Sequence, residues 1–180
     1  MSNSSVSAYP SIFKQERPRL LSALGSITAG GVIENIQPIG SSSVPGLAGS
    51  GRVDIGLSVW PFPVDGAVLA GLGYHPVNGF APDALQRYEN ANGQVQLWLV
   101  NAETPFLEHA VLIRDYLSHS EAARQDFLAN RAGKSAFFTR ILPDAQRWWV
   151  AHHGFAPLEA IAAAFLGTGE AKPADFPWYH

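Results

Sequence analysis

Residues 39–59, IGSSSVPGLAGSGRVDIGLSV, combine two features that proteins use to handle phosphates. Gly40 permits a tight turn with close backbone approach. Hydroxyl and N–H groups that could surround an anion follow directly, from Ser41, Ser42 and Ser43. Asp54 comes next on a predicted strand, where a carboxylate could hold Mg²⁺ beside a triphosphate. Taken as composition, the same stretch also fits a plain turn connecting two strands.

A second carboxylate is missing from the place where phosphoryl-transfer chemistry needs it. Two-metal catalysis fixes its ions between carboxylates, and a strand usually presents them one residue apart. Gly56 occupies that position. A single Asp on a strand gives weak and mobile Mg²⁺ binding at best, so Asp54 is predicted to be a weak metal ligand.

The strand that carries Asp54 is the clearest element in the sequence. Over residues 52–60, apolar side chains alternate with polar or small ones, so Asp54 is expected to face away from the core. Residues 32–39 predict a strand before it, and Pro38 favours an edge position or an irregular end. Two further strands, 85–89 and 95–100, flank Asn92-Gly93 and predict a hairpin.

Helical periodicity accounts for most of the remaining chain. The predicted helices cover residues 11–26, 64–72, 105–118, 120–132, 143–152 and 157–166. Pro18 predicts a kink in the first helix or a start near it, and Ser120 is expected to cap the fourth. This order predicts an α+β protein with one mixed, mostly antiparallel sheet, helices packed on it and a helical C-terminal third.

Composition restricts the class of protein. The chain has 180 residues, 47% of them hydrophobic and 15% charged, which is typical of a globular protein. We expect one domain over 1–180, with a loose start at 1–10 and an irregular tail at 167–180. The net charge of −3 argues against general nucleic-acid binding. No apolar run is long enough to span a membrane, and the first residues do not resemble a signal peptide, so a cytoplasmic location is expected. The absence of cysteine excludes disulfides and thiolate catalysis.

Four stretches resemble the GrpB family in order and spacing. They are IGSSSVPGL at the serine turn, EHAVLIRDYL from residue 108, FKQERPRLLSALG near the start, and LAGLGYHPV from residue 69. The resemblance runs from about residue 9 to residue 155, and the turn is its most specific part. It implies a nucleotidyltransferase-like fold with a palm of the DNA polymerase β type, marked by Gly-Ser followed by a strand with Asp-x-Asp.

The same resemblance implies roles for individual residues. Gly40 and the three serines would seat phosphates, Asp54 would hold a metal, and Arg114 would stabilise developing negative charge. His109 and Arg124 would join the ligand site. The ligand implied is a nucleotide or another phosphorylated small molecule, and the activity is at most Mg²⁺-dependent nucleotidyl transfer. Neither the acceptor nor the oligomeric state follows from the sequence.

Several positions depart from the family pattern, and most of them remove catalytic groups. Besides Gly56, they are Pro38 for His, Ser50 for Lys, Gln96-Leu97-Trp98 for His-Leu-His, and His152 for Lys. Imidazole and ammonium groups that would neutralise transition-state charge are thus lost. We therefore expect impaired or absent catalysis, unless the fold brings Glu34 or Glu89 within metal reach.

Structural interpretations compete with the functional ones. Asp115 could bond another element while Arg114 covers an apolar surface, His109 could be a buried histidine, and Arg124 a surface charge. Trp148-Trp149 fits a core edge or an interface better than a base-stacking platform, and the adjacent His152 and His153 point apart, which argues against zinc. The competing function is a non-catalytic protein-interaction domain on the same fold.

Overall fold

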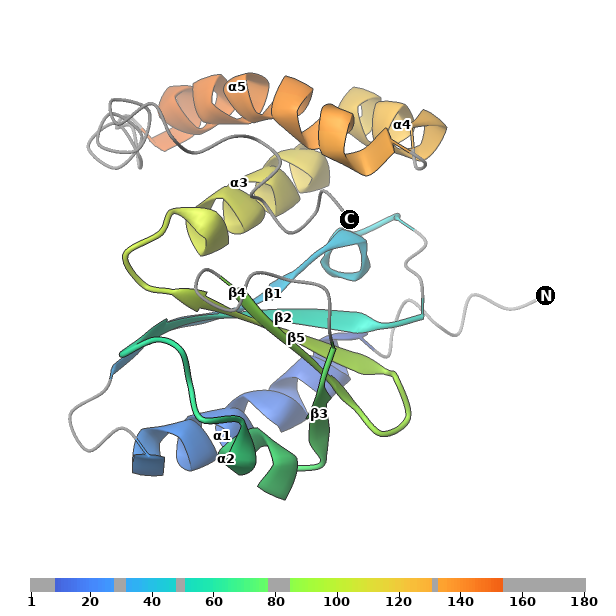
Figure 1. Ribbon diagram of the computed structural model, residues 1–180. Coiled ribbons are helices and arrows are strands. Elements are labelled where there is room, and N and C mark those ends of the chain that lie inside the picture. Colours follow the sequence, from blue (N-terminus) through green and yellow to red (C-terminus); the bar gives the residue numbers. More distant parts are fainter. Residues whose placement is uncertain (1–8, 28–31, 48–50, 78–84, 131–132, 154–180) are drawn as a thin grey trace. The chain divides into compact units, whose positions relative to one another are not determined.

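The computed structural model describes residues 9–27, 32–47, 51–77, 85–130 and 133–153 (Figure 1). The chain divides into two compact units, Met1–Leu107 and Glu108–His180. Each unit is described here by itself, and the expectation of one domain stays a prediction.

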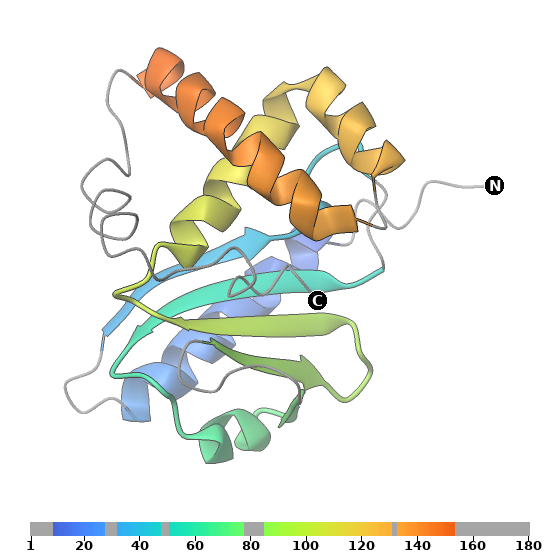
Figure 2. The same ribbon diagram turned by 45° about the horizontal axis from the view of Figure 1, so that its top comes forward.

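The first unit is built on a five-stranded sheet. Its strand order is β1 (Val32–Ile39), β2 (Val53–Trp60), β5 (Val95–Asn101), β4 (Leu85–Asn90) and β3 (Tyr74–Pro76). Figure 2 shows the strands lying side by side in this order. Only β2 and β5 run parallel, so the predicted mixed, mostly antiparallel sheet is confirmed. β1 is an edge strand, as Pro38 suggested, and β3 was missed because it is only three residues long.

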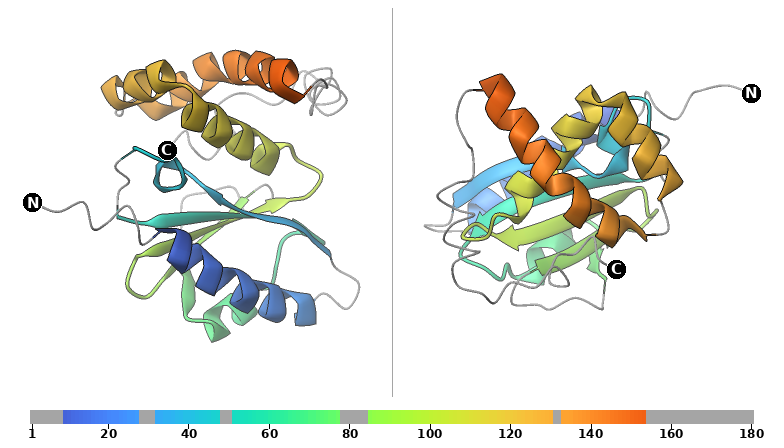
Figure 3. Two further views of the ribbon diagram at one scale, coloured as in Figure 1. Left: turned by 180° about the vertical axis from the view of Figure 1, so that it is seen from behind. Right: turned by 90° about the horizontal axis from the view of Figure 1, so that it is seen from above.

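Two helices, α1 (Tyr9–Ile27) and α2 (Gly66–Gly71), cover one face of this sheet (Figure 3). Leu20 and Leu24 of α1 are fully buried and belong to one core with the inward-facing residues of β2 and β5. The helix runs without a break through Pro18, so a start near that residue was wrong. It also includes residues 9 and 10, which were expected in a loose terminus; residues 1–8 lie outside the described part of the chain.

The hairpin between β4 and β5 forms as the sequence predicted. Gly93 has φ +67°, a left-handed conformation that glycine adopts without strain, and its N–H donates to the carbonyl of Asn90 at 2.8 Å. This turn fixes the register in which Arg87 lies opposite Trp98 and Glu89 lies opposite Gln96.

The second unit contains most of α3 (Phe106–His119), and α4 (Glu121–Ala129) and α5 (Lys134–His153). Ser120 caps α4 as predicted, because its side chain accepts from the N–H of Ala123 at 3.2 Å. The helix predicted at 143–152 begins at Lys134 instead and passes through Pro143. The predicted helix at 157–166 and the tail fall outside the described residues. No helix in the described ranges is long and apolar enough to cross a membrane.

Candidate functional site

The serine turn lies directly against Asp54. Its three serines form a short 3₁₀ helix, Ser41–Ser43, after Gly40, which has φ +73°. A Cβ atom added to Gly40 would lie 2.6 Å from Oδ2 of Asp54. Both the backbone conformation and this close approach therefore require glycine. Ser43 closes the turn, since its N–H and its hydroxyl both donate to the carbonyl of Gly40, at 3.2 and 2.6 Å.

Two side chains of the neighbouring parallel strand satisfy Asp54 with neutral donors. The indole Nε1 of Trp98 donates to Oδ1 of Asp54 at 3.0 Å. With the Gln96 amide oriented so that both of its ends are satisfied, its nitrogen donates to the same oxygen at 3.2 Å, and its oxygen accepts from Arg52 at 3.0 Å. Register explains the contacts, because Asp54 pairs with Gln96 and Gly56 with Trp98. Trp98 and Gln96 thus hold the carboxylate in place.

A second guanidinium belongs to the same face of the sheet. Arg87 on β4 lies opposite Trp98, and its guanidinium carbon is 5.4 Å from the centre of the indole ring. Burial lowers the pKa of Arg87, and the positive charge of Arg52 lowers it further, while Glu89 and Asp54 oppose both effects. Because two cations repel each other here, an anionic ligand would relieve that repulsion.

Apolar side chains fill the place where a second carboxylate would project. A Cβ atom added to Gly56 would lie 2.5 Å from Cδ1 of Leu107 and 3.1 Å from Cδ1 of Ile39. Gly56 and Leu107 are both buried, and Leu107 is fully so. The packing of this unit therefore leaves little room for a side chain at Gly56.

The described residues do not fit a pair of Mg²⁺ ions. Magnesium needs oxygen ligands, whereas the groups that face Oδ1 of Asp54 are N–H donors. Glu89 does not replace the missing carboxylate: β4 is two strands from β2, about 10 Å away at the usual strand spacing, and Glu89 bonds His75 at 3.2 Å. The side chain of Glu34 lies outside the described residues. In the described ranges, no three His, Asp or Glu side chains are grouped to hold a metal.

The remaining predicted site residues lie in the second unit, and their ligand roles stay predictions. Arg114 and Asp115 bond each other, with Nε 2.7 Å from Oδ1. Arg124 donates to the carbonyls of Leu117 and Ser118 at 2.8 and 2.9 Å, which satisfies the end of α3. This contact gives Arg124 a structural role.

His109 is buried, and this burial lowers its pKa to about 4. It is therefore neutral at pH 7 and brings no positive charge to a phosphate. The structural interpretation, a buried histidine, fits these properties.

The two tryptophans of α5 differ in their surroundings. Trp149 packs against the buried cluster of Leu112 and Ala145, which agrees with a core edge. Trp148 lies among aromatic rings, with centroids 4.8 Å from His119 and 5.0 Å from His152.

Sequence reasoning missed three residues of the sheet face: Arg52, Arg87 and Leu107. The strand alternation contained the signal for the two arginines. Arg52 precedes Asp54 by two residues, and the Asn-Gly hairpin places Arg87 beside Trp98. Nothing local indicated Leu107, which is far from Gly56 in sequence.

Comparison with known proteins agrees with this architecture. The profile of the family described as GrpB protein matches residues 3–140, and the chain therefore belongs to the GrpB family. The crystal structure of conserved protein GrpB from Enterococcus faecalis is similar, with a TM-score of 0.59 at 18% identity over 79% of this chain and 95% of that one. It confirms the predicted α+β fold class. A comparison with curated proteins gave no match.

Two structures of GLD-2 complexes show weaker similarity. The GLD-2/RNP-8 complex gives a TM-score of 0.49 at 12% identity, over 98% of this chain and 71% of that one. The non-canonical poly(A) polymerase complex GLD-2–GLD-3 gives 0.43 at 12% identity, over 68% and 41%. TM-scores below 0.5 do not by themselves establish a shared fold.

Proposed function

We propose that this GrpB-family protein binds a nucleotide or another phosphorylated small molecule on the sheet face beside Asp54, without two-metal nucleotidyl transfer. The observation that carries the proposal is the packing of Leu107 and Ile39 over Gly56. It supports lost catalysis, because the space for the second carboxylate is occupied while the rest of the face remains polar.

The polar part of the face has the chemistry for phosphate. Arg52 and Arg87 are two guanidinium groups that interact electrostatically with each other, and guanidinium binds phosphate oxygens in a forked geometry. The serine turn begins on the same side, where Gly40 lies against Asp54. Glu89, an acid on the same face, bonds Nε2 of His75 at 3.2 Å.

Asp54 has a different role in this proposal from that of a metal ligand. Its hydrogen bonds to Trp98 and Gln96 hold it beside Gly40, so it positions the turn and the amide that in turn bonds Arg52. Binding by guanidinium and hydroxyl groups does not need a cation, and we expect ligand affinity to change little when Mg²⁺ is removed.

Thermal unfolding tests the proposal. A ligand that binds only the folded state raises its stability by about 2.7 kcal/mol at a hundredfold excess over Kd. ATP, GTP, CTP, UTP and inorganic tripolyphosphate would each be titrated, once with Mg²⁺ and once with EDTA. At least one should stabilise the wild type in both conditions.

Variants locate the binding. Arg87→Gln should weaken that ligand about tenfold, as expected for one lost charge-assisted hydrogen bond. Arg17→Gln is the matched control, because Arg17 is an exposed cation on α1, which covers the opposite face of the sheet. Equal weakening by both variants would indicate a general charge effect. If none of the probes stabilised the wild type, the proposal would be overturned.

One observation favours the competing function, a non-catalytic interaction domain. Around the half-buried Trp148, Tyr116 and the imidazoles of His119 and His152 form an aromatic group. Trp at a surface is typical of protein contacts. If no phosphorylated probe binds, this group is the candidate contact of the second unit.

A further inference from the structure

A pocket of about 410 Å³ lies within the first unit, between the first two turns of α1 and the serine turn. It is separate from the sheet face described above. Val53 lines the pocket from one side of β2, whereas Asp54, the next residue, points to the other side. The two sites share only the serine turn as a wall.

Most of the pocket wall is apolar. Tyr9 and Phe13 of α1 and three prolines line it, together with Val44 and Val53. The volume falls within the range of about 300–1,000 Å³ that is usual for small-molecule sites, which are mostly apolar with a few polar groups. The rings of Tyr9 and Phe13 present flat surfaces that favour a flat apolar ligand.

Among the polar groups of the described wall, the charge is positive and comes from one residue. Lys14 is the sole charged residue among the described lining residues, and the others with polar side chains besides Tyr9 are Ser42 and Ser43. The hydroxyl of Ser43 is used within the turn, where it donates to Gly40. Ser42 is the other serine of the lining.

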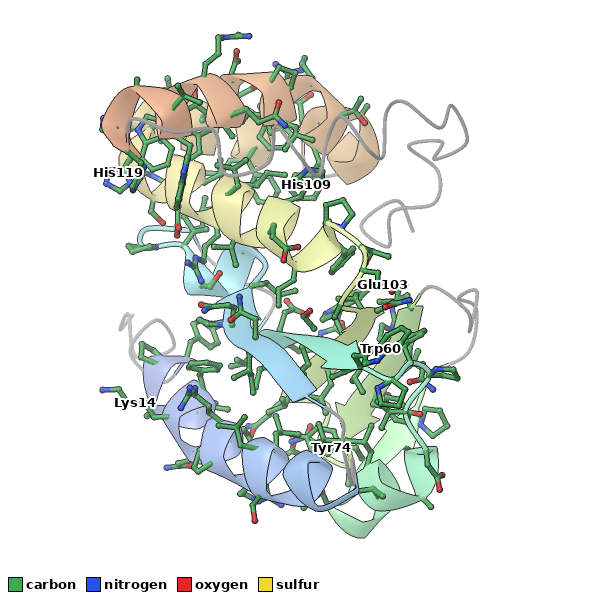
Figure 4. All side chains as sticks on the ribbon, turned by 90° about the vertical axis from the view of Figure 1, so that its left-hand side faces the viewer. Lys14, Trp60, Tyr74, Glu103, His109 and His119 are labelled. Atoms are coloured by element: carbon green, nitrogen blue, oxygen red, sulfur yellow. The ribbon has the colours of Figure 1, made fainter. Side chains whose placement is uncertain are left out.

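Lys14 is in a position to pair with an anion. In the described ranges no ion pair involves it, and Glu16, the acid nearest in sequence, bonds Arg19 at 2.6 Å and the Tyr74 hydroxyl at 2.8 Å. Figure 4 shows Lys14 projecting outward from α1. A ligand whose apolar body fills the pocket would place a terminal anion near this ammonium group.

We propose that this pocket binds a small amphiphilic carboxylate, with an aromatic or other flat apolar body inside and the carboxylate at Lys14 and Ser42. A nucleotide fits less well, because the walls offer few groups that could read the polar edge of a base. The inference is independent of the proposed phosphate site.

The test uses 2-naphthoate as the probe, followed by amide resonances in ¹H–¹⁵N spectra of the full chain. Millimolar 2-naphthoate should shift the amides of Phe13, Ser42 and Val53 in a saturable way. The indole N–H of Trp98 reports the sheet face and should stay in place. 2-Naphthamide, which has the same ring system without the charge, should bind more weakly.

Charge variants separate a specific site from general apolar binding. Lys14→Gln should weaken 2-naphthoate about three- to fivefold, the range of a solvent-exposed ion pair, and should leave 2-naphthamide unchanged. Lys14→Glu should weaken it further. Lys14 is exposed, so neither change should affect folding, and Arg17→Gln on the next turn is the matched control.

Two results would overturn the inference. One is the absence of saturable shifts at the pocket amides in the folded wild type. The other is equal binding of 2-naphthoate to the wild type and Lys14→Glu. Failure at this pocket leaves the nucleotide titrations unaffected, because those are followed by thermal unfolding and located by Arg87→Gln.

Discussion

Restoring the second carboxylate by Gly56→Asp should destabilise the protein and should not create a metal site. The new Cβ would lie 2.5 Å from Leu107 and 3.1 Å from Ile39, and the first distance is too short for any real contact. Overpacking of this kind costs about 1–3 kcal/mol. A carboxyl group against two apolar side chains adds about 1–3 kcal/mol. The sum of about 2–6 kcal/mol is a large part of a typical folding free energy of about 5–15 kcal/mol.

Urea denaturation of a small set of variants measures these terms. Gly56→Ala should show the steric cost without the charge. Leu107→Ala alone should cost about 2–5 kcal/mol, because Leu107 is fully buried. In the double variant Gly56→Asp/Leu107→Ala, the two costs should not add, and the coupling should be about 1–2 kcal/mol in favour of the double variant.

Metal binding by the same variants completes the test. Calorimetry with Mn²⁺ should detect tighter binding to Gly56→Asp/Leu107→Ala than to Gly56→Ala/Leu107→Ala. Both variants have room for an ion beside position 56, but only the first has two carboxylates. If Gly56→Asp alone were as stable as the wild type and bound Mn²⁺ well, the packing over Gly56 would not be what prevents a metal site there.

The other predictions concern single contacts. Gly40→Ala should cost about 1–3 kcal/mol from its φ of +73° and ψ of −179°, a region essentially restricted to glycine, and more from the clash with Asp54, measured by urea denaturation. Arg124→Ala should cost about 1 kcal/mol, since two carbonyls at the end of α3 lose a donor, and Arg124→Lys should recover part of it. The pKa of His109 is about 4 folded and about 6.5 unfolded, so the unfolded state takes up the proton first as pH falls. Stability should therefore be full above pH 6.5 and decrease by up to about 3 kcal/mol toward pH 4, and His109→Phe should remove that decrease. A wild type with the same pH profile as His109→Phe would contradict the assigned cause.

The elements that sequence reasoning found are those with strong local signals. The alternation around Asp54 and the Asn92-Gly93 turn predicted β2, β4 and β5, because period-two patterning and turn chemistry act over a few residues. The prolines were less informative. Pro18 and Pro143 both lie inside continuous helices, where tertiary packing outweighs the lost backbone hydrogen bond. In α5, Phe137 packs edge-on against Phe127 of α4 at 5.3 Å, a contact that no local pattern predicts.

The candidate site was predictable in part for the same reason. The motif identified the turn and Asp54, and the departures from the family pattern identified Gln96, Trp98 and Gly56 as the altered positions. What these altered positions do to the site could be derived only from the folded structure. Trp98 lies 44 residues from Asp54 in sequence, and only the parallel register of β2 and β5 brings its indole to the carboxylate. The packing of Leu107 over Gly56 likewise depends on tertiary structure.

The most direct test of the central claim follows the Trp98 indole N–H while ATP or tripolyphosphate is titrated in EDTA. The indole bonds Asp54 and stacks under Arg87, so it reports the proposed site itself. The account predicts a saturable shift that persists without Mg²⁺ and weakens in Arg87→Gln. An indole resonance that stays unchanged at millimolar ligand, or moves only when Mg²⁺ is present, would contradict it.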